Sequence, residues 1–257
     1  MNAVSPARVI WVAVDSTGDH PSLSLALAAI PDAAVDKPYV IKIAPGIYTE
    51  TEPVVLKTYV DVEGSGQNTT TINCACITGN AAVISATTIT AEIRHLTINN
   101  TGGGFLAFGV YTNGVADGSF SMLHVTATAT GGTGNNFGVL NSLSSSPTMT
   151  NVTATATGGS NLNYGVGNFD SSSPTMTNVT ATATGGIFSY GVYNSSSSPT
   201  IRNSSITGST ASISNVGTSN AKVADTALGG AVDGNGFFCV GVYDTDFAAA
   251  NDICVIP

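Results

Sequence analysis

Acidic side chains, which supply the general acids and bases of many hydrolytic sites, are scarce in the middle of this sequence. Asp170 is the one acid between Gly118 and Val223, and the others lie toward the two ends of the chain. Hydrolysis of a glycosidic bond uses two carboxyl groups about 5–9.5 Å apart. The middle of the chain offers no such pair, and we expect no catalytic residues there. Asp244 and Asp246 are a weak calcium candidate, because Ca²⁺ takes oxygen ligands, but solvation in a loop is the preferred interpretation.

Basic side chains are scarcer still, with 7 Lys plus Arg against 16 Asp plus Glu and a net charge of −9. A phosphate backbone is bound by a stripe of Lys and Arg, so we expect no nucleic-acid partner. Apolar runs stay shorter than the roughly 18 residues of a membrane span, so we expect no membrane insertion. The composition suggests neither a metal nor an organic cofactor. A charged fraction of 9% with 42% hydrophobic residues indicates a folded chain, not a disordered one.

The four cysteines fall into two pairs. Cys239 and Cys254 flank a short C-terminal segment, and we expect them to form a disulfide that closes the last loop. Cys74 and Cys76 are two residues apart and would point to one face of a strand, where a direct bridge is strained, so we interpret them as small buried hydrophobic residues. A disulfide favours an exported protein, extracellular or on the cell surface. The first residues lack the basic head and apolar core of a signal peptide, as expected of a trimmed mature chain.

The sequence contains an internal repeat, and the repeat determines how the secondary-structure elements are arranged. Pro147, Pro174 and Pro199 recur at steps of 27 and 25 residues within related segments, and the repeat covers roughly residues 80–210. Each copy holds three short runs in which small and apolar residues alternate, separated by Gly, Asn or Ser. Period-2 alternation predicts strands. Three strands in ~27 residues cannot form a core alone, but stacked coils about 4.8 Å apart can, because each strand then pairs with those above and below.

Several kinds of residue recur at the same place in each coil. Two sets of Asn lie where the chain must bend, and their side chains can form amide ladders there; His95 and His124 share a position with Asn151 and are interpreted as corner residues. The aromatic residues before Gly-Val share the parity of the inward Val, which predicts an interior place for them. The two Asn sets are Asn141, Asn168, Asn194 and Asn151, Asn178, Asn203, and the aromatic set is Phe108, Phe137, Tyr164, Tyr190.

Two outward-facing sets of residues are candidate ligand surfaces. One is a three-by-three Thr grid with spacings of about 4.8 Å and 6.7 Å, similar to the Thr-x-Thr surfaces of ice-binding solenoids, although Thr is also an ordinary outward strand residue. The other is a row in which Tyr111, Leu140 and Tyr193 are interrupted by Gly167 and whose aromatic rings could stack on sugars or pack against loops. The Thr grid consists of Thr126, Thr128, Thr130, Thr153, Thr155, Thr157, Thr180, Thr182 and Thr184.

The first 66 residues differ from the repeats. They predict a strand at 9–14, a short amphipathic helix at 23–30 and strands at 39–43 and 59–63. This order, with its Ser-Leu helix start, Pro-Gly-x-Tyr-x-Glu and Gly-Ser-Gly segments, resembles the opening of pectinesterases and related right-handed parallel β-helix proteins of the pectin lyase-like class. The residues that carry the resemblance are Ser22, Leu23, Ala26, Pro45, Gly46, Tyr48, Glu50, Gly64, Gly66 and Thr71.

The resemblance implies a fold and an exposed end covered by the helix, but its catalytic motifs are not present. An esterase of this class uses two Asp, two Gln and an Arg, whereas the one Gln of this chain is Gln67, in a turn. Lyases of the class use Ca²⁺ held by acids and a basic residue. Arg94 and Arg202 share a row but lie about four coils apart, roughly 19 Å, and no acidic cluster flanks either one in the sequence.

The sequence therefore predicts an all-β protein, a right-handed parallel β-helix of three sheets and seven or eight coils, with a short N-terminal capping helix. We expect one domain over 1–257, with a cap and first coils at 1–66, repeat coils at 67–210, and last coils and a C-terminal cap at 211–257. The leading hypothesis is an exported, non-catalytic structural or carbohydrate-binding module whose partner is a polysaccharide. A polysaccharide lyase or hydrolase and an ice-binding protein are the alternatives. Lateral or end-to-end packing of copies into a homo-oligomer stays open.

Overall fold

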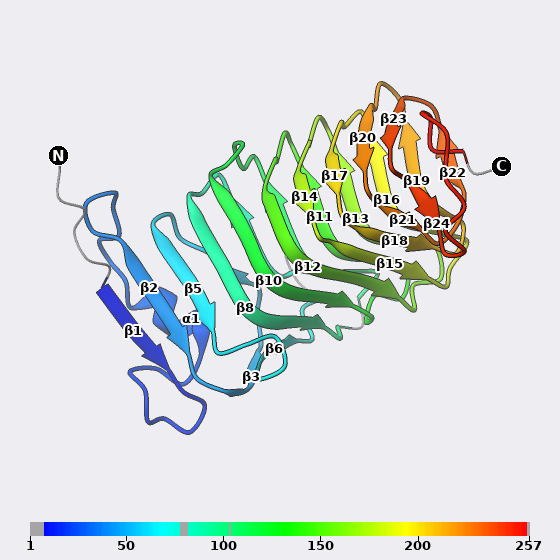
Figure 1. Cartoon of the computed structure of the whole chain (residues 1–257). Coiled ribbons are helices and arrows are strands. Elements are labelled where there is room, and N and C mark those ends of the chain that lie inside the picture. The colour runs from blue at the N-terminus through cyan, green and yellow to red at the C-terminus, as the bar shows by residue number, and fades with distance from the viewer. Residues whose placement is uncertain (1–7, 78–81, 103, 256–257) are drawn as a thin grey trace.

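The protein is a right-handed parallel β-solenoid of about seven turns, with the two chain ends at opposite ends of the solenoid (Figure 1). The computed structural model describes residues 8–77, 82–102 and 104–255. The first residues, which were compared with a signal peptide above, lie outside the described residues. All strand pairs within the sheets are parallel, and neighbouring rungs are in register with the repeat. The predicted fold is thus confirmed.

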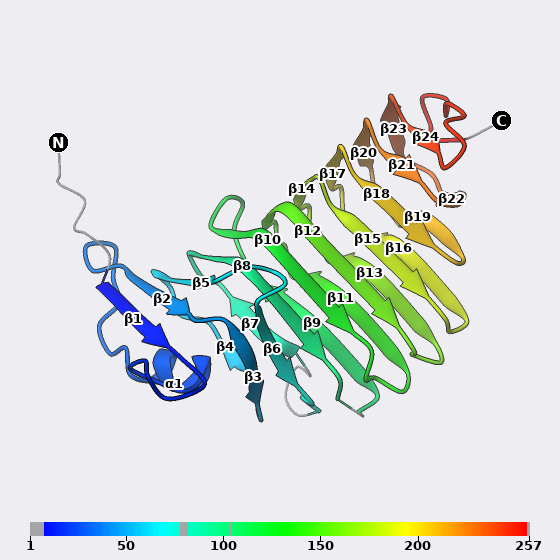
Figure 2. The ribbon, with the colours of Figure 1, turned by 60° about the horizontal axis from the view of Figure 1, so that its bottom comes forward.

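The larger sheet has sixteen strands and is folded lengthwise into two wings (Figure 2). The first wing contains ten rungs: β1 (Arg8–Val12), β2 (Tyr39–Ile43), β5 (Val60–Gly64), β8 (Ala91–Asn100), β10 (Phe120–Ala129), β12 (Thr148–Thr157), β14 (Thr175–Thr177), β17 (Thr200–Arg202), β20 (Ala221–Ala224) and β23 (Phe237–Val240). The second wing contains the later halves of β8, β10 and β12 together with β3 (Gly46–Glu50), β6 (Thr70–Cys74), β15 (Thr180–Thr184), β18 (Ser205–Gly208), β21 (Ala227–Leu228) and β24 (Tyr243–Asp244).

The third side of the solenoid is a separate eight-stranded sheet, which we call the third sheet. Its strands are β4 (Val54–Val55), β7 (Ala82–Thr87), β9 (Leu106–Asn113), β11 (Asn135–Ser142), β13 (Leu162–Phe169), β16 (Phe188–Ser195), β19 (Ala211–Val216) and β22 (Val232–Gly234). On the rungs from β8 to β17, the bend between the two wings occurs at one residue per rung, and this residue has a left-handed backbone. The φ values are 58° at His95, 52° at His124, 54° at Asn151, 55° at Asn178 and 49° at Asn203.

The bend explains why Asn recurs at this position, since Asn accepts left-handed backbone more readily than most residues. The two histidines occupy the same column: the His95 and His124 rings stack with centroids 5.1 Å apart, and Nδ2 of Asn151 lies 3.2 Å from Nε2 of His124. Their interpretation as corner residues is confirmed.

A second Asn ladder is buried inside the solenoid. Nδ2 of Asn141 donates to Oδ1 of Asn168 at 2.8 Å, Asn168 donates to Asn194 at 2.9 Å, and Asn194 donates to Asn215 at 2.8 Å. All but Asn215 are fully buried, so the chain of amides satisfies polar groups that water cannot reach. Apolar columns form the rest of the interior, as in the row Met122, Met149, Met176 and Ile201.

Helix α1 (Leu23–Ala28) lies at the N-terminal end and buries Leu23, Ala26 and Leu27 against the core. Glu50 holds its start: Oε1 accepts from the Leu23 backbone N–H at 2.9 Å, and Oε2 accepts from Oγ of Ser24 at 2.6 Å. A carboxylate at a helix N-terminus satisfies free N–H groups and faces the positive end of the helix dipole. Glu50, one of the residues that carry the family resemblance, is therefore architectural.

The C-terminal end is closed by the predicted disulfide between Cys239 and Cys254, whose Cα atoms are 5.4 Å apart. The prediction for the other pair was wrong, because Cys74 and Cys76 also form a disulfide, with Cα atoms 5.1 Å apart. β6 ends at Cys74, so Cys76 is not on a strand and the turn brings the two Cα atoms within normal bridging distance. Both cysteines are buried, as expected.

Candidate functional site

The outer surface of the third sheet contains a continuous group of aromatic rings over β9, β11, β13 and β16, which we call the aromatic face. Its rungs are in register, so that Phe108, Phe137, Tyr164 and Tyr190 form one column and Tyr111, Leu140, Gly167 and Tyr193 another. The rings of the aromatic face are Phe108, Tyr111, Phe137, Tyr164, Phe169, Phe188, Tyr190 and Tyr193.

The prediction that the first column shares the interior with Val was wrong. These rings are almost fully buried, but they belong to a cluster separate from the main core and pack against the half-buried Tyr111, Leu140 and Tyr193. The glycine after each ring explains the difference. A Cβ at Gly138 would lie 2.6 Å from the Thr155 backbone nitrogen, so this position points inward and must be Gly. Its preceding neighbour Phe137 then points outward.

Ring contacts connect the face from end to end. Centroids are 5.9 Å apart for Tyr111 and Phe108, and 5.2 Å apart for Phe108 and Phe137. Those of Phe137 and Tyr164 are 5.0 Å apart, and those of Tyr164 and Tyr193 are 4.6 Å apart with planes at 9°. All these separations lie in or near the range in which aromatic pairs attract. The four rungs therefore form one apolar platform.

Gly167 does not interrupt this platform, contrary to the row inferred from the sequence. A Cβ at Gly167 would lie 3.0 Å from Cε2 of Phe169 and 3.1 Å from Cδ1 of Phe137. The Phe169 ring also lies 5.3 Å from Tyr193 and 6.3 Å from Phe137. The missing side chain thus leaves room for a ring that comes from the end of the same strand.

The platform is partly accessible to solvent and keeps neutral hydroxyl groups. Phe188 is 45% exposed, and Tyr111 and Tyr193 are half-buried. Asn113 donates from Nδ2 to the Tyr111 hydroxyl at 2.7 Å, which fixes that ring. Burial, followed by the charge of Asp233, raises the pKa of Tyr193. Burial likewise raises the pKa of Tyr164 well above its ordinary value. These phenols therefore stay protonated at neutral pH.

The Thr grid lies on the outer face of the second wing, where its columns are aligned as predicted. One column passes through Thr126, Thr153 and Thr180, and another through Thr128, Thr155 and Thr182. The first column continues toward the N-terminus through Thr97 and Thr71. At that end it is not bare, because Gln67 donates from Nε2 to Oγ1 of Thr126 at 3.2 Å and accepts from Thr97 at its backbone oxygen.

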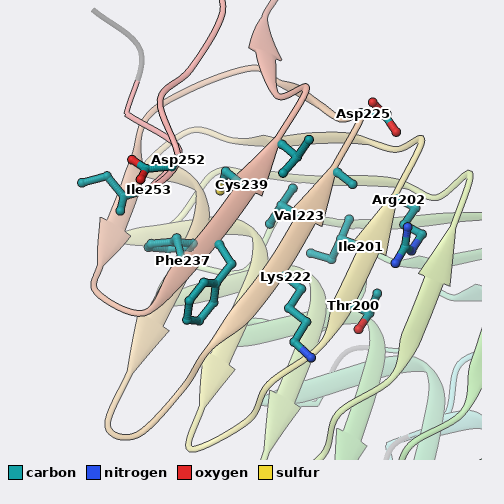
Figure 3. A pocket seen from close by; sticks show the side chains of 13 residues that line it. Thr200, Ile201, Arg202, Lys222, Val223, Asp225, Phe237, Cys239, Asp252 and Ile253 are labelled. Atoms are coloured by element: carbon teal, nitrogen blue, oxygen red, sulfur yellow. The ribbon is translucent and has the colours of Figure 1, made fainter.

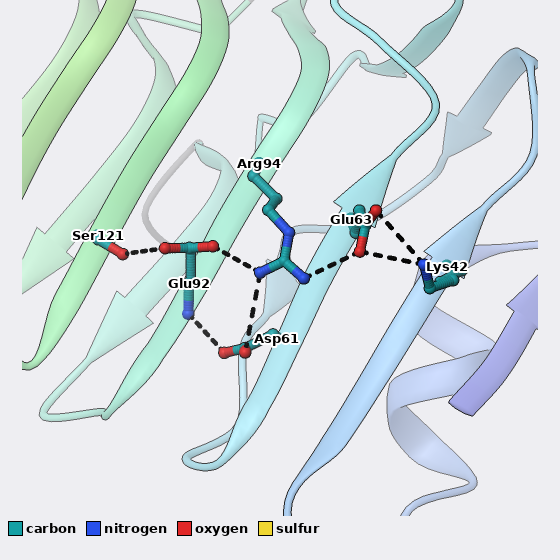
Figure 4. A network of polar contacts seen from close by, with 6 residues as sticks. All are labelled: Lys42, Asp61, Glu63, Glu92, Arg94 and Ser121. Atoms are coloured by element: carbon teal, nitrogen blue, oxygen red, sulfur yellow. Dashed lines mark hydrogen bonds and ion pairs between the residues drawn. The ribbon is translucent and has the colours of Figure 1, made fainter. Parts of the chain in front are cut away.

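A polar cluster that the sequence analysis missed lies on the outer face of the first wing (Figure 4). Arg94 contacts three carboxylates: Glu63 at 2.9 Å, Asp61 at 4.0 Å, and Glu92. Lys42 lies 3.4 Å from Glu63. The signal was present as two charged pairs spaced i, i+2, in β5 and β8. It went unrecognised because the two strands are about 30 residues apart in sequence and adjacent only in space.

The electrostatics of this cluster are those of a cross-rung ion network. Burial opposes ionisation of Glu63, but the hydrogen bonds and charges of Arg94 and Lys42 outweigh it and lower the pKa of the Glu63 carboxyl. Burial raises the pKa of Asp61, although its Oδ1 accepts from the Glu92 backbone N–H at 2.8 Å. Glu92 in turn accepts from Oγ of Ser121 at 2.9 Å. Each carboxylate is thus engaged with a partner.

The weak calcium candidate lies in the last loop. Oδ1 of Asp244 accepts from the backbone N–H groups of Asp246 at 2.9 Å and Ala248 at 2.8 Å, so this carboxylate fixes the loop. Within residues 8–77, 82–102 and 104–255, no group of three or more His, Cys, Asp and Glu side chains is placed to hold a metal ion. The same part of the chain contains no helix long and apolar enough to cross a membrane.

Comparison with solved structures finds pectin methylesterases, which share the right-handed β-helix of the pectin lyase-like class. Pectin methylesterase PemA from Erwinia chrysanthemi is 13% identical, with a TM-score of 0.65 over 97% of this chain and 93% of that one. The carrot enzyme is 16% identical, with a TM-score of 0.59 over 90% of this chain and 87% of its own. The enzyme from Yersinia enterocolitica is 14% identical, with a TM-score of 0.58 over 90% and 92%.

At these identities the likeness establishes the fold and nothing further. No protein-family model matches the sequence. A search of curated proteins likewise finds no match.

Proposed function

We propose that this protein is an exported carbohydrate-binding module without catalytic activity, and that a polysaccharide lies along the aromatic face. The observation that carries the proposal is the unbroken group of rings from Tyr111 to Phe188, which spans four rungs and is partly open to solvent. Three intervals of about 4.8 Å make this platform about 14 Å long, more than a single sugar needs.

The chemistry of the face suits a neutral or weakly charged glycan. Aromatic rings offer flat apolar surface to the C–H faces of sugars, and a phenol hydroxyl adds a hydrogen bond at the edge. Tyr193 combines both properties, because it is half-buried and stacked on Tyr164 and stays protonated at neutral pH. A rigid sheet also presents the rings without ordering a loop, which lowers the entropic cost of binding.

Export and the type of glycan have independent support. Two disulfides favour an oxidising compartment. The structural neighbours are named as pectin methylesterases, and two of them were solved with a hexasaccharide bound. Pectin is therefore the first ligand to test.

The distribution of acids around the aromatic face supports the non-catalytic part of the proposal. Asp170 follows β13 and Asp233 lies on β22, three rungs further along the third sheet. Three rungs correspond to about 14 Å, beyond the 5–9.5 Å that separate paired carboxyl groups in glycosidases. Gln67 is on the second wing, where it contacts Thr126 and cannot serve the aromatic face.

Affinity electrophoresis tests the proposal with methyl-esterified pectin, polygalacturonate, alginate and xyloglucan as probes. We expect retardation by at least one polysaccharide, and a loss of about tenfold in affinity on Phe188→Ala or Tyr193→Ala. Phe247→Ala is the matched control, because Phe247 is an exposed ring in the last loop. Equal losses for all three variants, or no retardation by any probe, would refute binding at this face. Release of methanol or of new reducing ends would refute the absence of catalysis.

A further inference from the structure

The outer face of the first wing has apolar residues at both ends and charges of opposite sign just inside each end. Alternate residues of its ten rungs point outward in two columns. The first column contains Val9, Val40, Asp61, Glu92, Ser121, Thr148, Thr175, Thr200, Lys222 and Phe238. The second contains Trp11, Lys42, Glu63, Arg94, Leu123, Thr150, Thr177, Arg202, Ala224 and Val240.

Both ends of this face are apolar and exposed. Trp11, the single Trp of the chain, is 53% exposed on β1. At the other end, Phe238 is 60% and Val240 is 72% exposed on β23. The middle rungs contain mainly Ser and Thr. Large apolar side chains that remain exposed on a sheet commonly mark an interaction surface, and Trp is prominent among residues that dominate binding energy.

The charges lie just inside the apolar ends and have opposite sign. The N-terminal cluster has three carboxylates and two cations, which leaves one negative charge in excess. Near the C-terminal end the columns contain Arg202 and Lys222, both exposed, and neither forms an ion pair with the described residues. Asp225 and Asp252 also border this region, but from the bend and from the C-terminal segment, not from the two columns.

We infer that this face binds a second copy of the chain in an antiparallel, two-fold symmetric dimer. The two-fold axis would run parallel to the strands, between β10 and β12. The first rung of one copy would then face the tenth rung of the other, the second would face the ninth, and so on. Glu63 on the third rung then faces Arg202 on the eighth, in the same column. Trp11 faces Val240, and Val9 faces Phe238. The face is therefore complementary to itself in charge at Glu63 and Arg202 and in apolarity at its two ends, as an isologous interface requires.

A hollow at the C-terminal end provides the place for Trp11. It measures about 660 Å³ and is lined by Arg202, Lys222, Phe238 and Val240, among others (Figure 3). The two columns supply twenty residues per copy, at the lower limit of the roughly 20–30 residues a side of a specific interface. Burial of Trp11 and the pairing of Arg202 with Glu63 are the gains that would hold the copies together, while Lys222 faces Val40 of the other copy. The dimer leaves the aromatic face free.

Sedimentation equilibrium from micromolar to millimolar concentration tests the inference, with Trp fluorescence as a second readout. We expect a monomer–dimer equilibrium, a blue shift of Trp11 emission on association, and weaker dimerisation at higher salt. The Arg202→Glu/Lys222→Glu double variant should weaken association at least tenfold. Lys37→Glu is the matched control, because Lys37 is an exposed cation paired with Asp32 outside the two columns.

Cross-linking distinguishes this interface from any other. Leu123→Cys lies next to the proposed axis and should cross-link two copies through a short bis-maleimide, whereas Thr182→Cys on the second wing should not. All substituted residues point outward, so the variants should fold normally. Circular dichroism and thermal melting check this independently of association. A protein that is monomeric throughout, a dimer insensitive to the double variant, or cross-linking through Thr182→Cys would overturn the inference.

Discussion

Tyr193 stacks on Tyr164 across neighbouring rungs, with ring centroids 4.6 Å apart and planes at 9°. Tyr193 also contacts Phe169 and Tyr190, so it joins two columns of the aromatic face. This contact depends on the inward-pointing glycine of each rung, which turns the ring before it toward solvent. A feature of the interior thus determines the composition of the surface.

Tyr193→Ala should lower the free energy of unfolding by about 2 kcal/mol, less than a fully buried ring would, because the side chain is half-buried. Tyr193→Phe retains the ring and should lose less than about 0.5 kcal/mol. Urea denaturation followed by circular dichroism measures both. Equal destabilisation by the two variants would show that the hydroxyl, and not stacking, stabilises this face.

Asn168→Ala should lower the free energy of unfolding by about 2 kcal/mol, because it leaves the buried Nδ2 of Asn141 and Oδ1 of Asn194 without these partners. Thr182→Ala, on the outer face, should cost less than about 0.5 kcal/mol. Thermal unfolding at several scan rates makes the comparison. Similar losses for both substitutions would contradict the importance of the buried ladder.

Glu63→Gln should reduce stability by about 1 kcal/mol at pH 7, and this loss should shrink as the pH falls. The native pKa of Glu63 lies below its ordinary value of 4.5. The carboxylate therefore contributes stability above that ordinary value, and the contribution is lost as the pH falls through the native pKa. Unfolding curves of both proteins between pH 3 and 8 provide the measurement. A difference that stays constant over this whole range would mean that Glu63 acts through packing.

The aligned Thr columns make thermal hysteresis worth measuring, although Gln67 covers part of one column. If this wing binds ice, purified protein should show hysteresis that Thr155→Lys abolishes, because a long charged side chain disrupts the flat lattice. Thr150→Lys, on the first wing, is the control. Absence of hysteresis at millimolar concentration would eliminate this alternative function.

The repeat alone predicted the solenoid, because the period of ~27 residues is visible in Pro147, Pro174 and Pro199 and each coil must find its backbone partners in its neighbours. The corner Asn residues and the Cys239–Cys254 bridge could likewise be predicted, since bends and a closing loop leave local signals. The side to which Phe137 points could not be predicted. Strand alternation places Phe137 on the same face as Val139. In the structure, however, Gly138 between them has no partner in the strand pairing, and this break in the alternation is visible only from the tertiary packing.

Side chains that meet across rungs were also beyond the sequence. Asp61 and Arg94 are 33 positions apart, and nothing local indicates that their strands are neighbours in the first wing. The same holds for Phe169, which fills the place left by Gly167 by reaching back along the strand, and for Cys76, which bridges because β6 ends before it. The sequence by itself determined the period and the faces of each coil, because these follow from local alternation. Tertiary structure decided which side chains share a surface, because that depends on the register between coils and on how closely the sheets approach.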